Sequence, residues 1–182
     1  MILVESDASG DWERSGGWDA LAEGAVRAAV AASRHAALID SSLAVEVSVK
    51  FTSDEEVRAL NAAYRNKDRP TNVLSFPLFD AELLPDIARA DSGEALLGDI
   101  VLAHGVCAAE AETKGVAVAV HATHLVVHGT LHLLGYDHEA GEEDAEAMEQ
   151  VERVALASLG IADPYAIPPD DDFLQVTSEV RS

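Results

Sequence analysis

The sequence predicts a single α/β (α+β) domain in which a small sheet of about four strands is surrounded by helices. The chain of 182 residues has the length of one ordinary domain, and 48% of its residues are hydrophobic. Residues 43–51 alternate apolar and polar side chains, which is the period of a half-buried strand. Residues 117–134 are apolar on almost every side, which is typical of a buried helix at the centre of a domain.

The first half of the chain alternates strand and helix patterns. Residues 1–5 predict a short strand, and the polar, glycine-rich residues 6–17 predict a loop. The alanine-rich residues 18–37 place apolar side chains on one side and predict an amphipathic helix. After the strand at 43–51, the next helix begins where a hydroxyl residue is followed by acids, and it runs to about Tyr64.

The second half is divided by turn residues, among which Gly115 and Gly135 each end a helix. Its expected elements are a strand at 73–76, an irregular insert or flap at 80–97, a strand at 98–103, and helices at 104–114, 117–134 and 139–159. We expect residues 1–164 to form the one domain. Residues 165–182 are acidic and contain proline, and we expect them to form a tail of low order.

The last expected helix has one apolar face, formed by Met148, Val151, Ala155 and Leu159. Its acids are interpreted as a face exposed to solvent. These acids are Glu142, Glu143, Asp144, Glu146, Glu149 and Glu152.

Composition limits the kinds of partner. The formal net charge is −21, from 33 acidic and 12 basic residues, and on charge alone this argues against nucleic acid as a partner. A group of the bases nevertheless falls close together, at Lys50, Arg58, Arg65, Lys67 and Arg69. A basic patch on an acidic body explains this group, and solvated bases on one helix and its following loop explain it equally well.

The sequence contains no apolar run of about 18 residues, and its N-terminus lacks a basic region followed by an apolar core. We therefore expect no membrane partner and a cytoplasmic location. The single cysteine, Cys107, cannot form an internal disulfide and is expected to be a small buried residue.

The run HGTLHLLGYDH at residues 128–138 predicts a metal site. His128 and His132 are four residues apart, so on a helix they share one face with Cβ atoms about 5–6 Å apart. Gly135 lets the chain turn after the helix, which can bring back His138 as a third ligand. Three imidazoles leave one tetrahedral position for water, which is the arrangement of a catalytic site for one zinc ion.

The same spacing matches the metal-ligand positions of the metzincin peptidases, with one departure. Gly129 occupies the position where those peptidases carry a glutamate as general base, so the run indicates a metal site and counts against a peptidase. His124 is an alternative third ligand, although a helical drift of about 40° over eight residues favours His138. Otherwise His124 is better explained as a hydrogen-bonded core histidine, with support of the ligands or contact with substrate as the alternatives. Asp137 either orients a ligand by hydrogen bonding or caps the next helix.

Three motifs together resemble the YbeY family of bacterial metal-dependent endoribonucleases, also called rRNA maturation factors. The motifs are LNAAYRNKDRPTNVLSFP at residues 60–77, LGDI at residues 97–100 and the histidine run at residues 128–138, within a resemblance that covers roughly residues 40–165. It implies a zinc-dependent, single-strand-specific endoribonuclease involved in 16S rRNA 3′-end maturation and ribosome quality control. The implied partners are ribosomal RNA and the small ribosomal subunit or its proteins, and not DNA.

By the same resemblance, the zinc ligands are His128, His132 and His138. Arg65 is the catalytic arginine, and its guanidinium offers a planar fork to phosphate that suits the charge of a phosphodiester transition state. The alternative for Arg65 is a structural salt bridge to Asp68 or Asp99. Lys67 and Arg69 are expected to extend a phosphate-binding track, although solvation at the surface explains them nearly as well.

Two other functions remain open from the sequence. The first is a non-catalytic, zinc-stabilised ribosome assembly factor that binds ribosomal proteins, which the acidic composition favours because those proteins are basic. The second is a zinc peptidase that lacks the usual glutamate base.

Overall fold

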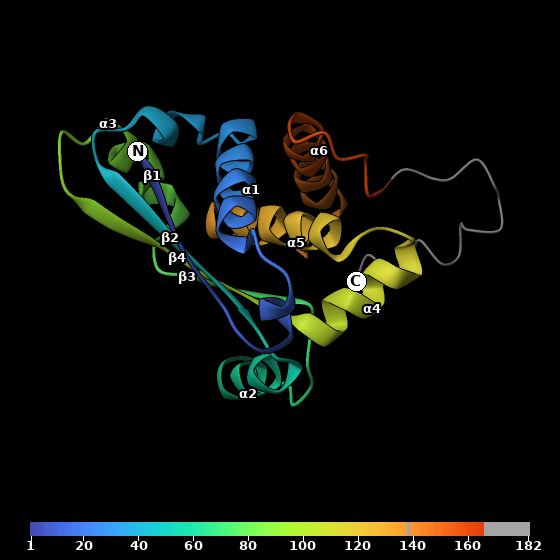
Figure 1. Cartoon of the computed structure of the whole chain (residues 1–182). Coiled ribbons are helices and arrows are strands. Elements are labelled where there is room, and N and C mark those ends of the chain that lie inside the picture. Colours follow the sequence, from blue (N-terminus) through green and yellow to red (C-terminus); the bar gives the residue numbers. More distant parts are fainter. Residues whose placement is uncertain (138, 166–182) are drawn as a thin grey trace.

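The computed structural model describes residues 1–137 and 139–165, which include four strands (Figure 1). The strands are β1 (Ile2–Ala8), β2 (Ala44–Thr52), β3 (Val73–Pro77) and β4 (Glu94–Ala103). The α-helices are α1 (Trp18–Ala32), α2 (Asp54–Arg65), α3 (Leu84–Arg89), α4 (His104–Lys114), α5 (Val118–Leu133) and α6 (Glu142–Ser158). Short 3-10 helices are η1 (Gly10–Arg14), η2 (Ala36–Asp40) and η3 (Ala81–Leu83). His138 and, apart from Tyr165, the expected tail lie outside the described residues.

The strands form one mixed sheet in the order β1-β2-β4-β3. β1, β2 and β4 are parallel to one another, and β3 pairs antiparallel with the edge of β4. In β2 every second side chain is buried, from Val45 to Phe51, so the period-two pattern in the sequence is confirmed. The predicted fold class, a single α/β domain with a sheet of about four strands, is confirmed.

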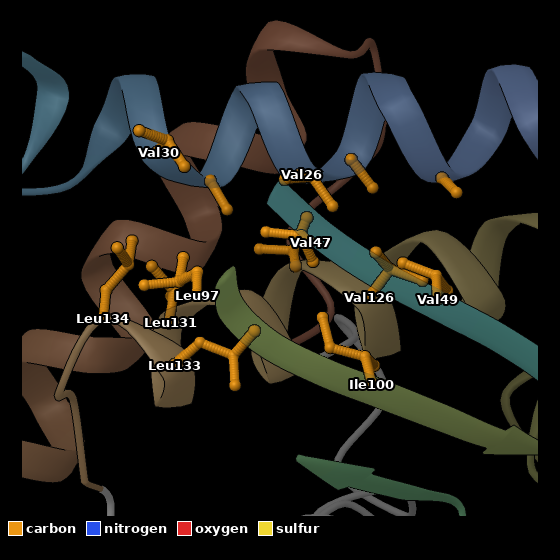
Figure 2. Close-up of a cluster of buried hydrophobic side chains, with 14 of the residues drawn as sticks. Val26, Val30, Val47, Val49, Leu97, Ile100, Val126, Leu131, Leu133 and Leu134 are labelled. Atoms are coloured by element: carbon orange, nitrogen blue, oxygen red, sulfur yellow. The ribbon is translucent and has the colours of Figure 1, made fainter. Parts of the chain in front are cut away.

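The sheet carries helices on both faces. Figure 1 shows α1, α5 and α6 on one side of the sheet and α2 on the other. The close-up in Figure 2 shows how α1, α5 and the sheet meet in the main core. Its labelled residues are Val26, Val30, Val47, Val49, Leu97, Ile100, Val126, Leu131, Leu133 and Leu134. On the opposite face, a smaller cluster joins Val57 of α2 to Leu74, Val101 and Ala103 of the sheet.

The predicted central helix is confirmed as α5. Of its 16 residues, 11 are buried, and only one flank is left for polar contacts. Among the described residues, no single helix is long and apolar enough to cross a membrane. Helices α4 and α5 reach the length and apolar composition of a membrane span only when they are counted together, and the chain bends by 113° between them.

The helix expected at 18–37 ends at Ala32 and is followed by η2, and two further segments differ from the sequence predictions. Residues 6–17 were expected to be a loop, but β1 continues to Ala8 and η1 buries Trp12 completely. The indole Nε1 of Trp12 donates a hydrogen bond to the carbonyl of Thr52 at 2.8 Å, and its ring meets that of Phe51 with centroids 5.1 Å apart. One aromatic side chain therefore orders a segment whose composition is otherwise typical of a loop.

The second difference is at residues 80–97, which form η3, α3 and the first part of β4 rather than an irregular insert. The expected strand start at Gly98 is in fact an interior position of β4. A Cβ there would lie 2.5 Å from the carbonyl oxygen of Phe76 and 2.6 Å from Cδ2 of Leu133. Gly98 therefore marks a close approach between β3, β4 and α5, a role that glycine commonly has inside strands.

A second close approach occurs at Gly129, in the middle of α5. A Cβ at this position would lie 2.9 Å from Cγ2 of Ile100 and 3.0 Å from Oγ of Ser75. The Ser75 hydroxyl also donates a hydrogen bond to the Gly129 carbonyl at 3.2 Å. The absence of a side chain at 129 therefore sets how closely α5 lies against the sheet.

We predict that Gly129→Ala lowers the free energy of unfolding by about 1–3 kcal/mol, because the added methyl group overpacks the interface with Ile100. The matched control is Gly24→Ala in α1, where the new Cβ would meet its nearest neighbour, Leu159, only at 4.0 Å. That control is expected to gain about 0.5–1 kcal/mol from helix propensity. Urea unfolding of both variants measures the difference, and equal effects of the two substitutions would contradict the close approach at Gly129.

Candidate active site

A cavity of about 1130 Å³ runs along the open flank of α5. All the predicted site residues that lie in the described part of the chain line this one cavity. They are the imidazoles His124, His128 and His132, the bases Arg65, Lys67 and Arg69, and the acid Asp137. The eighth, His138, lies outside the described residues.

His128 and His132 turn their rings toward each other from adjacent turns of α5. Their Nε2 atoms are 3.1 Å apart, and the ring centroids are 4.7 Å apart. Two ligands that bind one tetrahedral zinc ion at about 2.0–2.1 Å have donor atoms about 3.3–3.4 Å apart. The two nitrogens therefore fit two positions of one metal ion. Within residues 1–137 and 139–165, no group of three or more potential ligands is found, so the third position is not tested.

Glu152 of α6 lies behind this pair. Its carboxylate is completely buried, and Oε1 accepts a hydrogen bond from Nδ1 of His128 at 2.6 Å. Oε2 accepts from the hydroxyl of Tyr165 at 2.7 Å, and Nε2 of His124 lies 3.4 Å from Oε1. The interpretation of Glu152 as a solvent-exposed acid is wrong. Its position four residues after the buried Met148 places it on the inner face of α6.

The environment of Glu152 keeps it ionised. Burial by itself raises the pKa of a carboxyl group, but hydrogen bonds from His124 and His128 hold the pKa of Glu152 well below its ordinary value. Burial lowers the pKa of His124, and burial raises the pKa of Tyr165. Among the described residues, Nδ1 of His124 is buried without a hydrogen-bond partner. His124 contacts the carboxylate of Glu152, which also contacts His128. The ring centroids of His124 and His128 are 6.4 Å apart.

Arg65 is the last residue of α2 and faces the cavity from the opposite side. Its Nη2 donates a hydrogen bond to the carbonyl of Ser75 at 2.9 Å. The alternative of a salt bridge to Asp68 is wrong, because Asp68 pairs with Arg58 at 2.8 Å. No ion pair joins Arg65 to Asp99 or to any other acid in the described part of the chain.

The loop after α2 positions Lys67 and Arg69 at the same rim. Asn66 ends the helix in the left-handed conformation, with φ of 57°. The buried Asn61 then holds the loop from both sides. Its carbonyl accepts from the backbone N–H of Lys67 at 3.2 Å, and its side-chain amide donates to the carbonyl of Arg69 at 2.9 Å.

The described bases fall into two groups. One group forms ion pairs with acids and consists of Arg14, Arg27, Lys50, Arg58, Arg89 and Arg153. The other bases have no ion pair within residues 1–137 and 139–165. Of these, Arg65, Lys67, Arg69 and Lys114 all line the cavity. The fifth, Arg34, places its guanidinium carbon 4.1 Å from the ring centroid of Tyr136, which also lines the cavity.

The cavity therefore gathers bases that form no ion pair within the described residues, and the acids Glu110, Asp137, Glu139 and Asp163 line it as well. The group of bases that lie close together in the sequence divides accordingly. Lys50 and Arg58 form ion pairs with Glu56 and Asp68, whereas Arg65, Lys67 and Arg69 line the cavity. The bases at the rim can contact an anion locally.

Comparison with known proteins gives the family. The family model described as Endoribonuclease YbeY matches residues 17–160. The chain belongs to the endoribonuclease YbeY family. An endoribonuclease YbeY of Rhizorhabdus wittichii is 56% identical over 93% of this chain and 100% of its own length. Another, from Sphingopyxis alaskensis, is 54% identical over 91% of this chain and 98% of its own length.

The fold also has a solved relative. A Thermotoga maritima protein determined in solution matches with a TM-score of 0.53 and 22% identity, over 87% of this chain and 92% of that one. The resemblance to the YbeY family and the prediction that the chain is an enzyme are confirmed by these comparisons.

Within this YbeY fold, the structure adds residues that the sequence analysis did not select. Besides Glu152, they include Tyr165 and Lys114. They also include a hydrogen-bonded group in which Glu110 accepts from Nε2 of His121 at 2.8 Å and from Nδ2 of Asn72 at 3.0 Å. Helical spacing from Met148 was the available signal for Glu152. No local pattern marks the others, because their partners are distant in the sequence.

Asp137 lies on the rim of the cavity and is exposed. Its Oδ1 accepts a hydrogen bond from the backbone N–H of Glu139 at 2.9 Å, so its carboxylate stabilises the turn that follows α5. The alternative that Asp137 caps the next helix is wrong, because α6 begins at Glu142 with Gly141 at its N-cap and no side-chain cap hydrogen bond. The support of a metal ligand by Asp137 stays a prediction.

We predict that Glu110→Gln lowers the free energy of unfolding by about 1–2 kcal/mol near neutral pH, and that this loss shrinks in acid. Although burial alone would raise it, hydrogen bonds from His121 and Asn72 lower the pKa of Glu110. A lowered pKa stabilises the fold above the ordinary carboxyl range, and the stabilisation disappears as the pH falls through the lowered value.

Urea unfolding at about pH 7 and about pH 3 tests this, with the exposed Glu112→Gln on the same helix as the control. A loss for Glu110→Gln that is the same at both pH values would contradict the assignment.

Proposed function

We propose that this chain is a zinc-dependent endoribonuclease that cleaves single-stranded RNA in 16S rRNA 3′-end maturation and in ribosome quality control. Its relatives are named endoribonucleases, and the family resemblance supports ribosomal RNA, the small subunit and its proteins as cytoplasmic partners. The observation that carries the proposal is that one cavity holds a metal-spaced histidine pair and four bases that form no ion pair within residues 1–137 and 139–165.

In this proposal, His128 and His132 hold zinc through Nε2, and His138 is the third ligand. The spacing of 3.1 Å between the two nitrogens supports the first pair. When bound, zinc supplies a Lewis acid and lowers the pKa of a water molecule toward 7, which neutral-pH hydrolysis of a phosphodiester requires.

The protein's own groups bind the substrate strand. Arg65 has one N–H engaged with the Ser75 carbonyl, which fixes the direction of the guanidinium and leaves its other donors for a phosphate. Lys67 and Arg69 lie on the same rim, and Lys114 extends from α4 at another part of the lining. Positive groups along the cavity bind successive phosphates of one strand and stabilise the charge that develops during cleavage.

The peptidase alternative meets a physical obstacle at residue 129. A Cβ there would lie too close to the side chains of Ile100 and Ser75, so a glutamate base does not fit unless these side chains shift. The non-catalytic assembly factor keeps one supporting observation, the formal net charge of −21, since basic ribosomal proteins complement an acidic partner. The acidic composition and the bases at the cavity are both compatible with an enzyme that reaches RNA on a ribosomal particle.

We predict that His128→Ala and Arg65→Ala each lower the cleavage rate of a single-stranded RNA by at least about 10²-fold, for different reasons. His128→Ala removes a zinc ligand and lowers the bound zinc, whereas Arg65→Ala keeps the zinc and loses a phosphate contact. The matched control is Arg58→Ala, because Arg58 is a neighbouring base already paired with Asp68.

Bound zinc per chain and cleavage of a labelled RNA, with and without ribosomal particles, give the two measurements. A wild type that cleaves no RNA under either condition would favour the assembly factor. Cleavage of peptides by the wild type would instead support the peptidase.

We also predict that Lys67→Ala, Arg69→Ala and Lys114→Ala each weaken the binding of single-stranded RNA by a few fold. Each lost phosphate contact reduces the slope of log affinity against log salt concentration by about 0.7. Lys50→Ala is the matched control, since Lys50 forms an ion pair with Glu56 and does not line the cavity. Fluorescence anisotropy over a salt series measures the slopes. Equal slopes for all four variants and the wild type would exclude these bases from the binding track.

A further inference from the structure

The two ring nitrogens of His128 have different environments. Nδ1 lies 2.6 Å from Oε1 of Glu152, and Nε2 lies 3.1 Å from Nε2 of His132. A carboxylate only accepts hydrogen bonds, so His128 donates from Nδ1. Nε2 is then the nitrogen that faces the proposed metal position, in the tautomer that a metal ligand requires.

Glu152 itself is held on both oxygens. Oε2 accepts from the hydroxyl of Tyr165 at 2.7 Å, while Oε1 faces His128 and His124. Tyr165 is held in turn by Asp163, whose Oδ1 accepts from its backbone N–H at 2.8 Å. Asp163 is paired with Arg153 of α6 at 3.0 Å. The carboxylate therefore has one well-defined direction, set by the chain that follows α6.

The composition of this pocket is unusual for a buried acid. A fully buried carboxylate is costly unless positive charge lies beside it, and the described side chains that contact Glu152 with polar atoms are two imidazoles and one phenol. Within the described residues, no lysine or arginine forms an ion pair with Glu152. A metal ion bound to the far nitrogen of His128 would supply that positive charge through the imidazole ring.

We propose that Glu152 is a positioning residue for zinc, which acts through His128, and that Tyr165 holds Glu152 in place for this role. The inference rests on the proposed zinc site. A carboxylate behind a ligating histidine orients the ring and makes its other nitrogen a stronger donor, and loss of such a partner commonly weakens metal binding by about 10–100-fold.

The decisive variant is Glu152→Gln, which keeps the size of the side chain and an oxygen able to accept from His128 but removes the charge. We expect the zinc dissociation constant, measured by competition with a chromophoric chelator, to rise by about 10–100-fold. Tyr165→Phe removes one hydrogen bond to the carboxylate, and we expect a rise of up to about tenfold. The control is Glu146→Gln, an exposed acid on the same helix, with a constant within about twofold of the wild type.

Two further measurements separate positioning from a purely structural role. The thermal unfolding midpoint of the zinc-free protein reports the contribution of Glu152 to the fold alone. In a double-mutant cycle, Glu152→Gln adds no further loss of zinc affinity once His128 is replaced by alanine, because its effect passes through that ring. A dissociation constant that is unchanged in Glu152→Gln, or a full additional loss in the His128→Ala background, would overturn the inference.

The measurement of zinc affinity needs no RNA, so the two proposals can fail separately. A wild type that binds zinc and cleaves no RNA contradicts the proposed function only. A wild type that binds no zinc contradicts both. If Glu152→Gln does not fold, Tyr165→Phe decides by the same constant, and a value equal to that of the wild type counts against the inference.

Discussion

The burial of α5 is the constraint on which the rest of the structure depends. The sheet covers one side of the helix, at a distance set by Gly129 and Gly98, and α1 and α6 pack around other sides. Only the flank with its histidines reaches the cavity. Because a buried helix cannot shift its turns independently, the separation of His128 and His132 is a property of the helix and does not depend on a loop.

The parts of the site that follow from local spacing were accessible from the sequence. Two histidines four residues apart identify a helix face, and a period-two run identifies β2, because both signals need only neighbouring residues. The placement of Arg65, Lys67 and Arg69 beside the histidines came from family motifs. Their approach in space depends on the sheet that brings β3 next to β4.

The parts that were missed depend on contacts between distant residues. Glu152 was grouped with the exposed acids, although helical spacing from Met148 already placed it on the inner face. Trp12 orders residues expected to be a loop through its contact with β2, and no local pattern shows that partner. The start of β4 was placed too late because Gly98 was read as a boundary, whereas it serves close packing inside the strand. Tertiary packing decides all three cases.

The order of the residues along the chain gives the Glu152 contacts a consequence for biosynthesis. The two described histidines of the proposed metal site belong to α5, but the groups that orient His128 come from α6 and from Tyr165. During synthesis, both histidines are therefore added to the chain before Glu152 and Tyr165, whose side chains position His128. The full set of described contacts around His128 can form only after Tyr165 has been added and has packed against α5 and α6.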